Sequence, residues 1–436
     1  MERLGKQLVE VFPPFQLGSR GAHTLQGACG HQPSPYQIAF QAIFADKRVL
    51  AIDSMSQYVS AEIQDSQNLI LISVREKLQN IPPLPCTGCI HRVPYKLRRT
   101  NEEAYVPRIV SIGPFHHGKQ NLQTMEAHKL RYLEKFLKLV EAKVSLEDCI
   151  RAIKSRIERI RDSYAESIDM SNENFVQMIL VDSAFIIELF LLSRYDSVDE
   201  IDPICRKPWL IDDVSRDLRL VENQLPFFIL EELFNLAFGS NENIADSFLK
   251  LSYKFFEGSE NINAFLELTL NSEVKHFVDM LRYSYIASAT RRSSKQPENF
   301  EFPPSALELW GAGVSFRKGT GNCLFNIKFR NRVLEMASLM LEDGTETLFR
   351  NLIAFEQYYY QNSSYITDYV HLLACLIKSS GDVKLLARKG IIENQLGSPM
   401  EVVSLIQNLR KETVVWGGKF YFASLCNELI EYCWNM

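Results

Sequence analysis

The segment Gly113-Pro-Phe-His-His-Gly-Lys119 has the spacing of a phosphate-binding loop, in which two glycines separated by four residues precede a lysine. Such a loop cradles phosphate oxygens with backbone N–H groups, and a Ser or Thr after the lysine binds magnesium. Here Gln120 follows the lysine and Pro114 removes one N–H donor, so the phosphate chemistry is incomplete. We therefore interpret the segment as a structural turn whose glycines and proline set the backbone geometry.

A second group, Cys86-Thr-Gly-Cys89-Ile-His91, has the close thiolate spacing of half a zinc site. Cys29 and His31 could donate the other two ligands, but we expect them to lie in a poorly ordered N-terminal extension. Ordinary small buried cysteines are the competing interpretation. The two thiols could also form a redox pair, although no βαβ pattern surrounds them.

His116 and His117 are adjacent, so in an extended or helical backbone their side chains point to different faces and rarely bind one metal together. Combined with the cysteines they could supply a nucleophile and a base, which gives the alternative of a hydrolase or transferase with or without zinc. No catalytic, cofactor-binding or metal site is complete in the sequence, and we expect a non-enzymatic protein without a cofactor. The candidate residues for the alternative are Cys86, Cys89, His91, His116 and His117.

The composition limits the classes of partner. The chain has 436 residues and a net charge of -5, so it lacks the excess of Lys and Arg that nucleic-acid binding requires. Its 9 cysteines are irregularly spaced, which indicates a reducing compartment. The first 16 residues do not have the apolar stretch of a secretory signal. We expect protein partners and no nucleic acid, and a cytoplasmic location if the chain is complete as given.

The elements that must position these residues are mostly helices. Apolar residues recur at alternating three- and four-residue steps from Leu130 to Val144, and again from Ile150 to Tyr164, which predicts two helices in a hairpin. Phe175 to Leu192 is the most apolar stretch, but Asp182 and Glu188 interrupt it, so we predict a buried core helix rather than a bilayer span.

The remaining pattern completes a mainly α fold with a turn-rich extended segment at residues 82–118. Residues 212–238 read as helix, which Pro226 should kink or restart. Alternation between residues 311 and 335, with Phe325, Ile327 and Phe329 on one side, predicts a small antiparallel sheet. Residues 287–299 contain no apolar face and are expected to be a mobile loop between two halves.

Several of these stretches together resemble the plant domain-of-unknown-function-247 family, whose members are also described as UPF0481 proteins. The resemblance covers about residues 68–434 and rests on motifs in the expected order. These are Cys89-Ile-His-Arg-Val-Pro94, Ala104-Tyr-Val-Pro107, Ser111-Ile-Gly-Pro-Phe-His-His-Gly118, Met125-Glu with Lys129, Leu180-Val-Asp182, Phe185 to Leu189, Glu222-Asn-Gln-Leu-Pro-Phe227, Leu352-Ile-Ala-Phe-Glu-Gln357, Gly381-Asp-Val383 and Gly390-Ile-Ile392.

The resemblance implies a plant protein with a mostly helical fold, no established enzymatic activity and, in many relatives, a C-terminal transmembrane helix. Some relatives are linked to recognition between pollen and stigma, as in self-incompatibility. It therefore implies a protein-interaction or signalling module at the inner face of a membrane. With the sequence pattern above, we expect a family domain over residues 66–436, made of a helical half at 66–286 and a β-hairpin plus helical half at 300–436, behind a poorly ordered extension at 1–65.

The chain departs from the family pattern in three places. Ser183-Ala184 replaces the usual Gly-Cys, residues 1–65 look foreign to the family, and the chain stops at Met436, so we expect the membrane anchor of the relatives to be missing. Because relatives use the C-terminal end as an approach to the membrane, we expect an exposed apolar face there. That face would comprise Phe420, Phe422, Leu425 and Leu429.

Overall fold

The computed structural model describes residues 68–78 and 88–434, except 142, 195–201, 203, 240–246, 258–261, 270–271, 288, 290–296, 298, 322 and 416–417. By its internal contacts the chain divides into two units, Met1–Pro83 and Leu84–Met436. The predicted extension at residues 1–65 lies outside the described residues, as does most of the predicted mobile loop at 287–299. In the first unit the structure describes a helix over residues 68–78.

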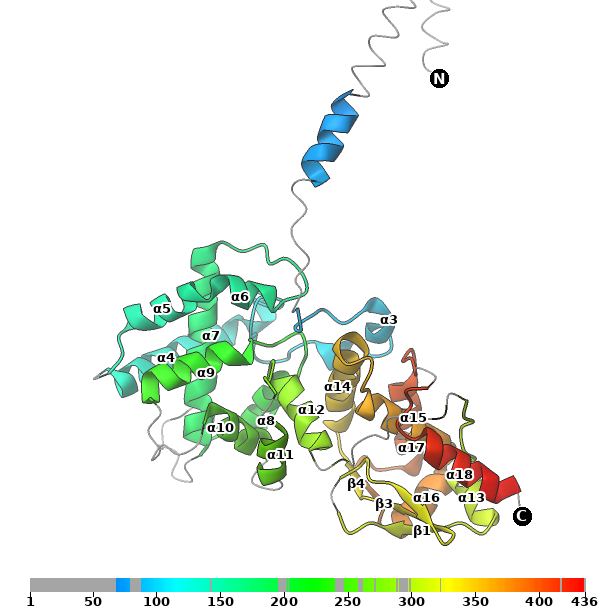
Figure 1. Ribbon diagram of the computed structural model, residues 1–436. Helices are drawn as coiled ribbons and strands as arrows, with labels where there is room; N and C mark the ends of the chain where they lie inside the picture. The colour runs from blue at the N-terminus through cyan, green and yellow to red at the C-terminus, as the bar shows by residue number, and fades with distance from the viewer. Residues whose placement is uncertain are drawn as a thin grey trace, which may run out of the picture. The chain divides into compact units, whose positions relative to one another are not determined.

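The second unit begins with a segment of short turns and then becomes helical. Its described part forms two lobes, one of helices only and one that also contains the strands (Figure 1). The turn segment contains α3 (Tyr95–Arg98) and the 3-10 turns η1 (Glu102–Tyr105) and η2 (Gln120–Leu122). The first lobe contains α4 (Gln123–Val140), α5 (Leu146–Ser155), α6 (Ile157–Asp162), α7 (Asn172–Ser193), α8 (Pro208–Asp217), α9 (Phe227–Phe238), α10 (Phe248–Glu257) and α11 (Ile262–Thr269).

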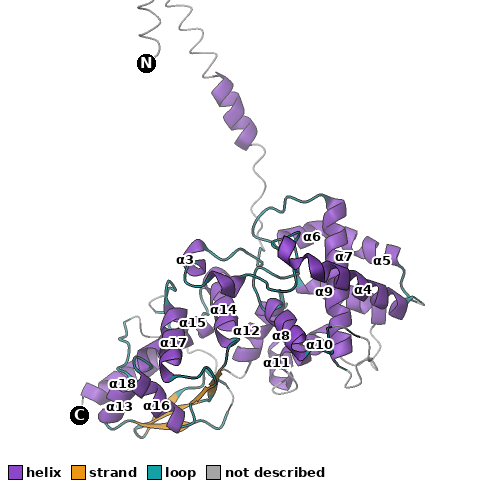
Figure 2. Cartoon of the chain, turned by 180° about the vertical axis from the view of Figure 1, so that it is seen from behind, coloured by secondary structure: helices purple, strands orange, loops and turns teal. Residues whose placement is uncertain are grey.

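The second lobe is connected to the first through α12 (Phe277–Ile286), which packs against α14 (Thr345–Tyr359). Figure 2 shows the strands gathered in this lobe, and loops that run between α3 and α6. Its other elements are α13 (Ala306–Gly311), β1 (Ser315–Lys318), β2 (Lys328–Arg330), β3 (Val333–Met336), β4 (Leu339–Leu341), α15 (Tyr365–Leu376), α16 (Ser380–Arg388), β5 (Ile392–Asn394), α17 (Pro399–Arg410) and α18 (Ala423–Trp434). The predicted fold class, mainly α with a small sheet, is confirmed.

The sheet that alternation predicted has the order β1-β3-β2. Strands β2 and β3 pair antiparallel, as predicted, and Phe329 lies opposite Leu334. Strand β1 joins β3 in parallel, with Phe316 opposite the same Leu334, so the sheet is mixed. A parallel neighbour needs a long connection, and the chain between β1 and β3 supplies it by passing through β2. Strands β4 and β5 form a separate parallel pair.

Helix α4 occurs where it was predicted, and Leu133, Leu137 and Val140 of the predicted face do pack against the core, but the centre of the buried face is rotated away from Leu130. Leu130 is 53% exposed, whereas Tyr132 and Phe136 are buried. The buried face also contains Lys129, whose ammonium group bonds with Asp182 on α7. This charged contact fixes the rotation of α4 against α7, and apolar spacing alone could not predict it.

Helix α7 is the central element of the first lobe. It begins after Ser171, whose hydroxyl accepts a hydrogen bond from the N–H of Asn174 at 3.3 Å. By length and composition α7 could cross a membrane, but 89% of its most apolar window is buried inside the protein. Asp182 and Glu188 are buried with it, at 1% and 6% exposure. The prediction of a buried core helix is therefore confirmed.

Two predicted helices are each interrupted. Ser145 and Asp148 form the capping box that opens α5, but Arg156 adopts φ -114° and ψ 5° and separates α5 from α6. The predicted helix over residues 212–238 likewise ends at Asp217 and restarts after Pro226. The nine residues between these helices carry the Glu222-Asn-Gln motif, whose side chains bond to the backbone of other segments.

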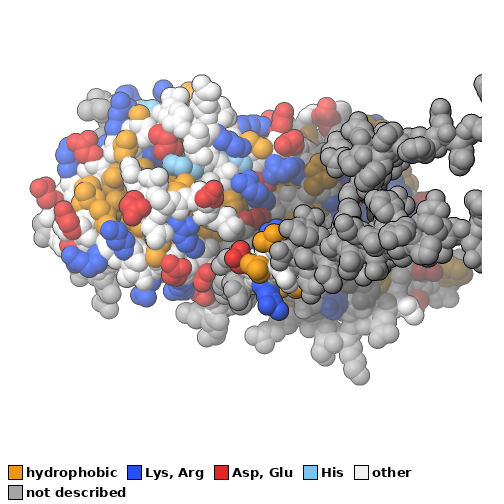
Figure 3. All heavy atoms as spheres, turned by 90° about the horizontal axis from the view of Figure 1, so that it is seen from above, with side chains coloured by type: hydrophobic (Ala, Val, Ile, Leu, Met, Phe, Trp, Pro, Cys, Tyr) orange, Lys and Arg blue, Asp and Glu red, His pale blue; other side chains and the backbone are white. Residues whose placement is uncertain are grey.

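The prediction of an exposed apolar face at the C-terminus is wrong. Phe420 and Leu429 are fully buried, and Phe422 and Leu425 are 3% and 9% exposed. Phe420 stacks on Phe300 with ring centroids 4.7 Å apart. These apolar side chains at the C-terminal end therefore pack inside the second lobe and are not exposed to a membrane surface. Figure 3 shows another face of the molecule, where Lys and Arg intermix with Asp and Glu instead of forming a patch of one sign.

Candidate functional site

The structure places the predicted site residues in separate surroundings. Cys89 and His91 are buried beside α12 and α14, whereas His116 is buried against the Glu222 motif. His117 is exposed, and Cys86 lies outside the described residues. Among the residues that the structure describes, His, Cys, Asp and Glu side chains form no group of three or more that could hold a metal ion.

Cys89 lies at the edge of a cavity of about 310 Å³ between the turn segment, α6 and the loop before α12. Its Sγ is 3.7 Å from the carbonyl oxygen of Ser163, to which the thiol donates. Burial, with a smaller contribution from Asp279, raises the pKa of the Cys89 thiol to about 12. Because the thiolate is the nucleophile, this cysteine is held in its unreactive form at neutral pH.

The groups beside Cys89 do not complete a nucleophilic site. In a Cys-His-Asp arrangement the acid accepts a hydrogen bond from the imidazole, which in turn faces the thiol. Here Asp279 accepts hydrogen bonds from the N–H of Lys275 and the hydroxyl of Tyr360, both at 3.0 Å. The Nδ1 atom of His276 caps α12 by accepting from the N–H of Asp279 at 3.3 Å. These side chains therefore hold the start of α12 in place.

Burial also keeps the histidines His91 and His116 neutral, because it lowers the pKa of each imidazole. His91 stacks on Tyr358, with ring centroids 3.8 Å apart, and burial lowers its pKa to about 4. His116 lies 3.5 Å from the carboxylate of Glu222, yet burial, followed by the positive charge of Lys119, lowers its pKa to about 3. Arg98 and the N–H of Val93 bond with that carboxylate instead, the latter at 2.6 Å.

The Gly113–Lys119 segment is a turn, as predicted. Gly113 has φ +71°, and a Cβ atom there would lie 2.4 Å from the carbonyl oxygen of Gln224. Its N–H donates to Asp182 at 2.8 Å. The same carboxylate accepts from Lys129 at 2.5 Å, and Lys129 also donates to the carbonyl oxygen of Ser111 at 2.9 Å. Although burial alone would lower the pKa of Lys129, Asp182 raises it, so the ammonium stays charged.

Residues at the end of α8 and just after it satisfy the backbone of the turn segment. Asn223 accepts from the N–H of Ile112 at 2.8 Å and donates to the carbonyl oxygen of Val110 at 3.0 Å. Asp217 accepts hydrogen bonds from three successive N–H groups, those of residues 108, 109 and 110, at 2.7 to 3.0 Å. A buried backbone without such partners would lose about 1–3 kcal/mol for each unpaired group.

Gln224 and Asn351 extend this network to the second lobe. Gln224 donates to the carbonyl oxygen of Leu218 at 2.7 Å and accepts from the N–H of Phe277, the first residue of α12, at 2.9 Å. Asn351 on α14 accepts from the N–H of Val221 at 2.9 Å and donates to the carbonyl oxygen of Ala104 at 2.8 Å. The motif side chains thus connect the turn segment with both lobes.

Sequence reasoning missed Asp217 and Asn351. One signal was available for Asp217, because it is the last residue of α8, where the helix dipole disfavours a carboxylate. An acidic residue at such a position indicates a partner elsewhere, here the N–H groups of the turn segment. Asn351 offers no comparable signal, since a single Asn inside a helix pattern is more often exposed.

The comparison with protein-family models gives a match to DUF247, described as a plant protein of unknown function, over residues 90–436. The chain belongs to the plant DUF247 family. An Arabidopsis thaliana relative, UPF0481 protein At3g47200, is 28% identical over 369 residues, which cover 79% of this chain and 77% of the relative. Putative UPF0481 protein At3g02645, from the same plant, is 24% identical over 74% of this chain and 78% of its own length. No solved structure matches.

The DUF247 motifs that carried the resemblance therefore have structural roles in this chain. Asp182, Glu222, Asn223 and Gln224 each place at least one side-chain oxygen on a backbone N–H of another segment. The interpretation of the Gly113–Lys119 segment as a structural turn agrees with the bond between Gly113 and Asp182. The resemblance to the family was itself a correct prediction.

Proposed function

We propose that this DUF247 protein is a non-enzymatic protein-interaction module that acts in recognition or signalling at or near a membrane. The proposal is supported first by the site geometry. The charged and polar groups of the motifs are occupied in holding backbone segments together, and the Cys89 thiol is kept protonated by burial. Among the described residues no observation favours the hydrolase or transferase alternative. The interaction must then use the surface.

The observation that carries the proposal is the helix at residues 68–78. Ile70, Leu71, Val74 and Leu78 lie on one side of this helix by their spacing and are between 47% and 63% exposed, and Leu69 and Ile72, at 67% and 52% exposure, extend its apolar surface to the other side. A short helix by itself is marginal in water, because its few hydrogen bonds barely offset the entropy of ordering the chain. It becomes stable when its apolar side is covered. A helix with this much exposed apolar surface fits a hydrophobic groove on a partner protein.

The proposal concerns a protein groove rather than insertion into lipid. The helix contains Arg75, Glu76 and Lys77, so its polar side carries both signs of charge instead of the purely basic face that anionic lipids attract. The membrane location is an inference from the family resemblance. The C-terminal residues add no support to this location, because Phe420 and Leu429 are buried.

The proposal is tested with the full chain and two variants. Leu71→Glu/Leu78→Glu places charge on the proposed binding side, and Leu139→Glu is the control, because Leu139 is a comparably exposed leucine on α4. Each chain is used to recover partners from plant extract, and the recovered protein is then purified and titrated against all three. We expect the wild-type and control chains to bind alike, and the double variant to bind at least about tenfold more weakly.

Three results would overturn the proposal. One is that the wild-type chain recovers no partner that binds in the purified titration. Another is that the double variant binds as tightly as the control. A third is that the pure chain turns over a substrate and loses that activity on Cys89→Ser substitution. Membrane proximity is checked separately by fractionating plant cells that express the tagged chain, because a purely soluble distribution would remove that part of the proposal.

A further inference from the structure

The three-stranded sheet of the second lobe turns one of its faces toward the core. Side chains alternate between the two faces of a sheet, so the register shows which residues share a face. Phe316, Leu334 and Met336 are at most 4% exposed. Phe329 also points inward, since its ring lies 5.6 Å from that of Tyr432 on α18. These residues form the inner face, and Figure 2 shows the strands together at the lower border of the lobe.

The opposite, outward face carries cations on both outer strands of the order β1-β3-β2. Arg317 on β1 and Lys328 on β2 are in register with Glu335, one on each side of it. Arg330 is the second cation on β2. Strands about 4.8 Å apart and alternate residues about 6.7 Å apart place the Cα atoms of the three cations within about 12 Å of one another. By register the outward face comprises Ser315, Arg317, Lys328, Arg330, Val333 and Glu335.

A single carboxylate stands among these cations. Glu335 pairs with Arg317 at 2.6 Å, and its side chain is 28% exposed against 65% for the arginine. Lys328 and Arg330 are exposed and form no ion pair with another described residue. The whole chain has a net charge of -5, so the positive excess is local to this face. An anionic group is therefore attracted here, although the protein as a whole repels it.

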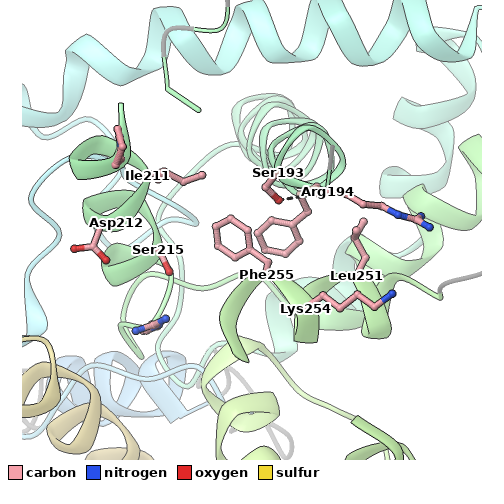
Figure 4. Close-up of a pocket in the computed structure, with 11 residues that line it drawn as sticks. Ser193, Arg194, Ile211, Asp212, Ser215, Leu251, Lys254 and Phe255 are labelled. Carbon is pink, nitrogen blue, oxygen red and sulfur yellow. Dashed lines mark hydrogen bonds between the residues drawn. The ribbon is translucent and has the colours of Figure 1, made fainter. Parts of the chain in front are cut away.

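Cations in the first lobe are arranged differently. A cavity of about 560 Å³ lies between the end of α7 and helices α8 and α10, and its lining includes Arg194, Lys254 and Asp212. Figure 4 shows the two cations on one side of this cavity and Asp212 on the other. Arg194 and Lys254 also have other polar contacts. Their charges therefore do not form one accessible positive surface, as those of the sheet do.

The outward face fits an extended acidic peptide better than a lipid surface. In an extended chain every second side chain lies on the same side, about 6.7 Å apart, which is also the spacing of Lys328 and Arg330 along β2. Two carboxylates at that spacing can each lie beside one of these cations. A lipid surface is bound by apolar side chains together with basic ones. Val333 is the one apolar residue of the outward set, and it is half-buried.

We propose that the outward face of the β1-β3-β2 sheet binds an extended acidic segment of a partner protein. The carboxylates of that segment lie beside Lys328 and Arg330, with Arg317 at the other end of the face. Because these cations are exposed, each contact is weak and is screened by salt. This surface is distinct from the proposed partner-binding helix at residues 68–78, so each can fail without the other.

The test uses the purified full-length chain and two fluorescently labelled peptides. One peptide alternates Glu with Ser, and the other alternates Gln with Ser, so the two differ in charge and share their length and spacing. Fluorescence anisotropy at low salt should show binding of the acidic peptide only. Raising the salt from about 50 mM to about 300 mM should remove most of that affinity, because the Debye length falls below the spacing of the charges. Vesicles of phosphatidylcholine with phosphatidylserine are tested in parallel by sedimentation.

Two variants of the sheet should change the affinity in opposite directions. Lys328→Gln/Arg330→Gln removes two cations and should weaken binding of the acidic peptide by about threefold or more. Glu335→Gln removes the carboxylate of the face and should tighten binding by about twofold. All three side chains lie on the outward face, and thermal unfolding of each variant checks that the fold is retained.

The controls make the same changes of net charge away from the sheet. Lys138→Gln/Arg151→Gln removes two cations whose side chains are 71% and 75% exposed on α4 and α5, and Glu134→Gln removes a carboxylate that is 65% exposed. Both controls should bind the peptide like the wild type. The proposal is overturned if the sheet variants behave like these controls. It is also overturned if the acidic peptide does not bind, which would leave the cations as protection of the strand edges, or if only the vesicles bind.

Discussion

The ion pair between Lys129 and Asp182 offers a direct test of the role assigned to the motif residues. Both side chains are almost completely buried, and the pair is 2.5 Å apart. Asp182 also receives the N–H of Gly113, and Lys129 also contacts the carboxylate of Glu126 at 2.7 Å. We consider Lys129→Met, which keeps the volume but removes the charge, and Asp182→Asn, which keeps an acceptor for Gly113.

The magnitudes follow from what each change leaves behind. Lys129→Met leaves a buried carboxylate without its cation, which should lower the free energy of unfolding by about 3–5 kcal/mol. Asp182→Asn should cost less, because Glu126 still neutralises the lysine. In the Lys129→Met background the sign should reverse, since Asp182→Asn then removes the uncompensated charge and should return about 2 kcal/mol. These are large fractions of a typical total stability of about 5–15 kcal/mol.

Urea denaturation followed by circular dichroism gives the four free energies of this cycle. Lys138→Met is the matched control, since Lys138 lies on the same helix and pairs with Glu134 at 2.6 Å, but its side chain is 71% exposed. It should remain close to the wild type. The reasoning is refuted if Lys129→Met costs no more than this control, or if Asp182→Asn destabilises the Lys129→Met variant.

Three further predictions concern the turn segment and the buried titratable groups. Gly113→Ala should destabilise the protein by about 1–3 kcal/mol more than Gly118→Ala in chemical denaturation, because both glycines have positive φ but only the first would clash with a carbonyl oxygen. Cys89 should be alkylated by iodoacetamide at pH 8 far more slowly than Cys433, judged by peptide mass spectrometry, and equal rates would contradict its burial and raised pKa. Stability should fall as the pH drops below about 6.5, since His91 and His276 have folded pKa values of about 4 and about 3; each should cost about 2 kcal/mol by pH 5. Burial raises the pKa of Asp279 to about 6, so protonation of this carboxyl should add back only about 1 kcal/mol of unfolding free energy over that interval. A denaturation midpoint that does not drop between pH 7.5 and pH 5 would contradict the assignment of neutral histidines.

Local chemistry was predictable from the sequence wherever neighbours along the chain decide it. Ser145 and Ser398 each form a capping box with the residue three positions later, and Pro399 takes the first position of α17, all of which follow from the local sequence. Pro226 restarts a helix because it has no N–H to donate and clashes with a preceding turn. These outcomes depend on a few successive residues, so one sequence contains the information.

Features decided by distant residues could not be predicted in the same way. The rotation of α4 depends on Asp182, which lies 53 residues after Lys129. The burial of Phe420 depends on Phe300, which stacks on it although it lies 120 residues earlier in the chain. In both cases the apolar spacing was compatible with more than one face, and only the three-dimensional partner selects one.

The same distinction bears on where function can lie in this family. A catalytic carboxylate needs an oxygen that faces substrate, but the oxygens of Asp217 are taken by three backbone N–H groups and Arg216 in a closed core. Asp182 is occupied in the same way by Gly113 and Lys129. Motifs of this kind specify how the turn segment is held, and they can be shared by proteins with different partners. On the proposed function, partner choice is encoded outside the motifs, in surface residues such as Leu71, where comparison of motifs alone would not detect it.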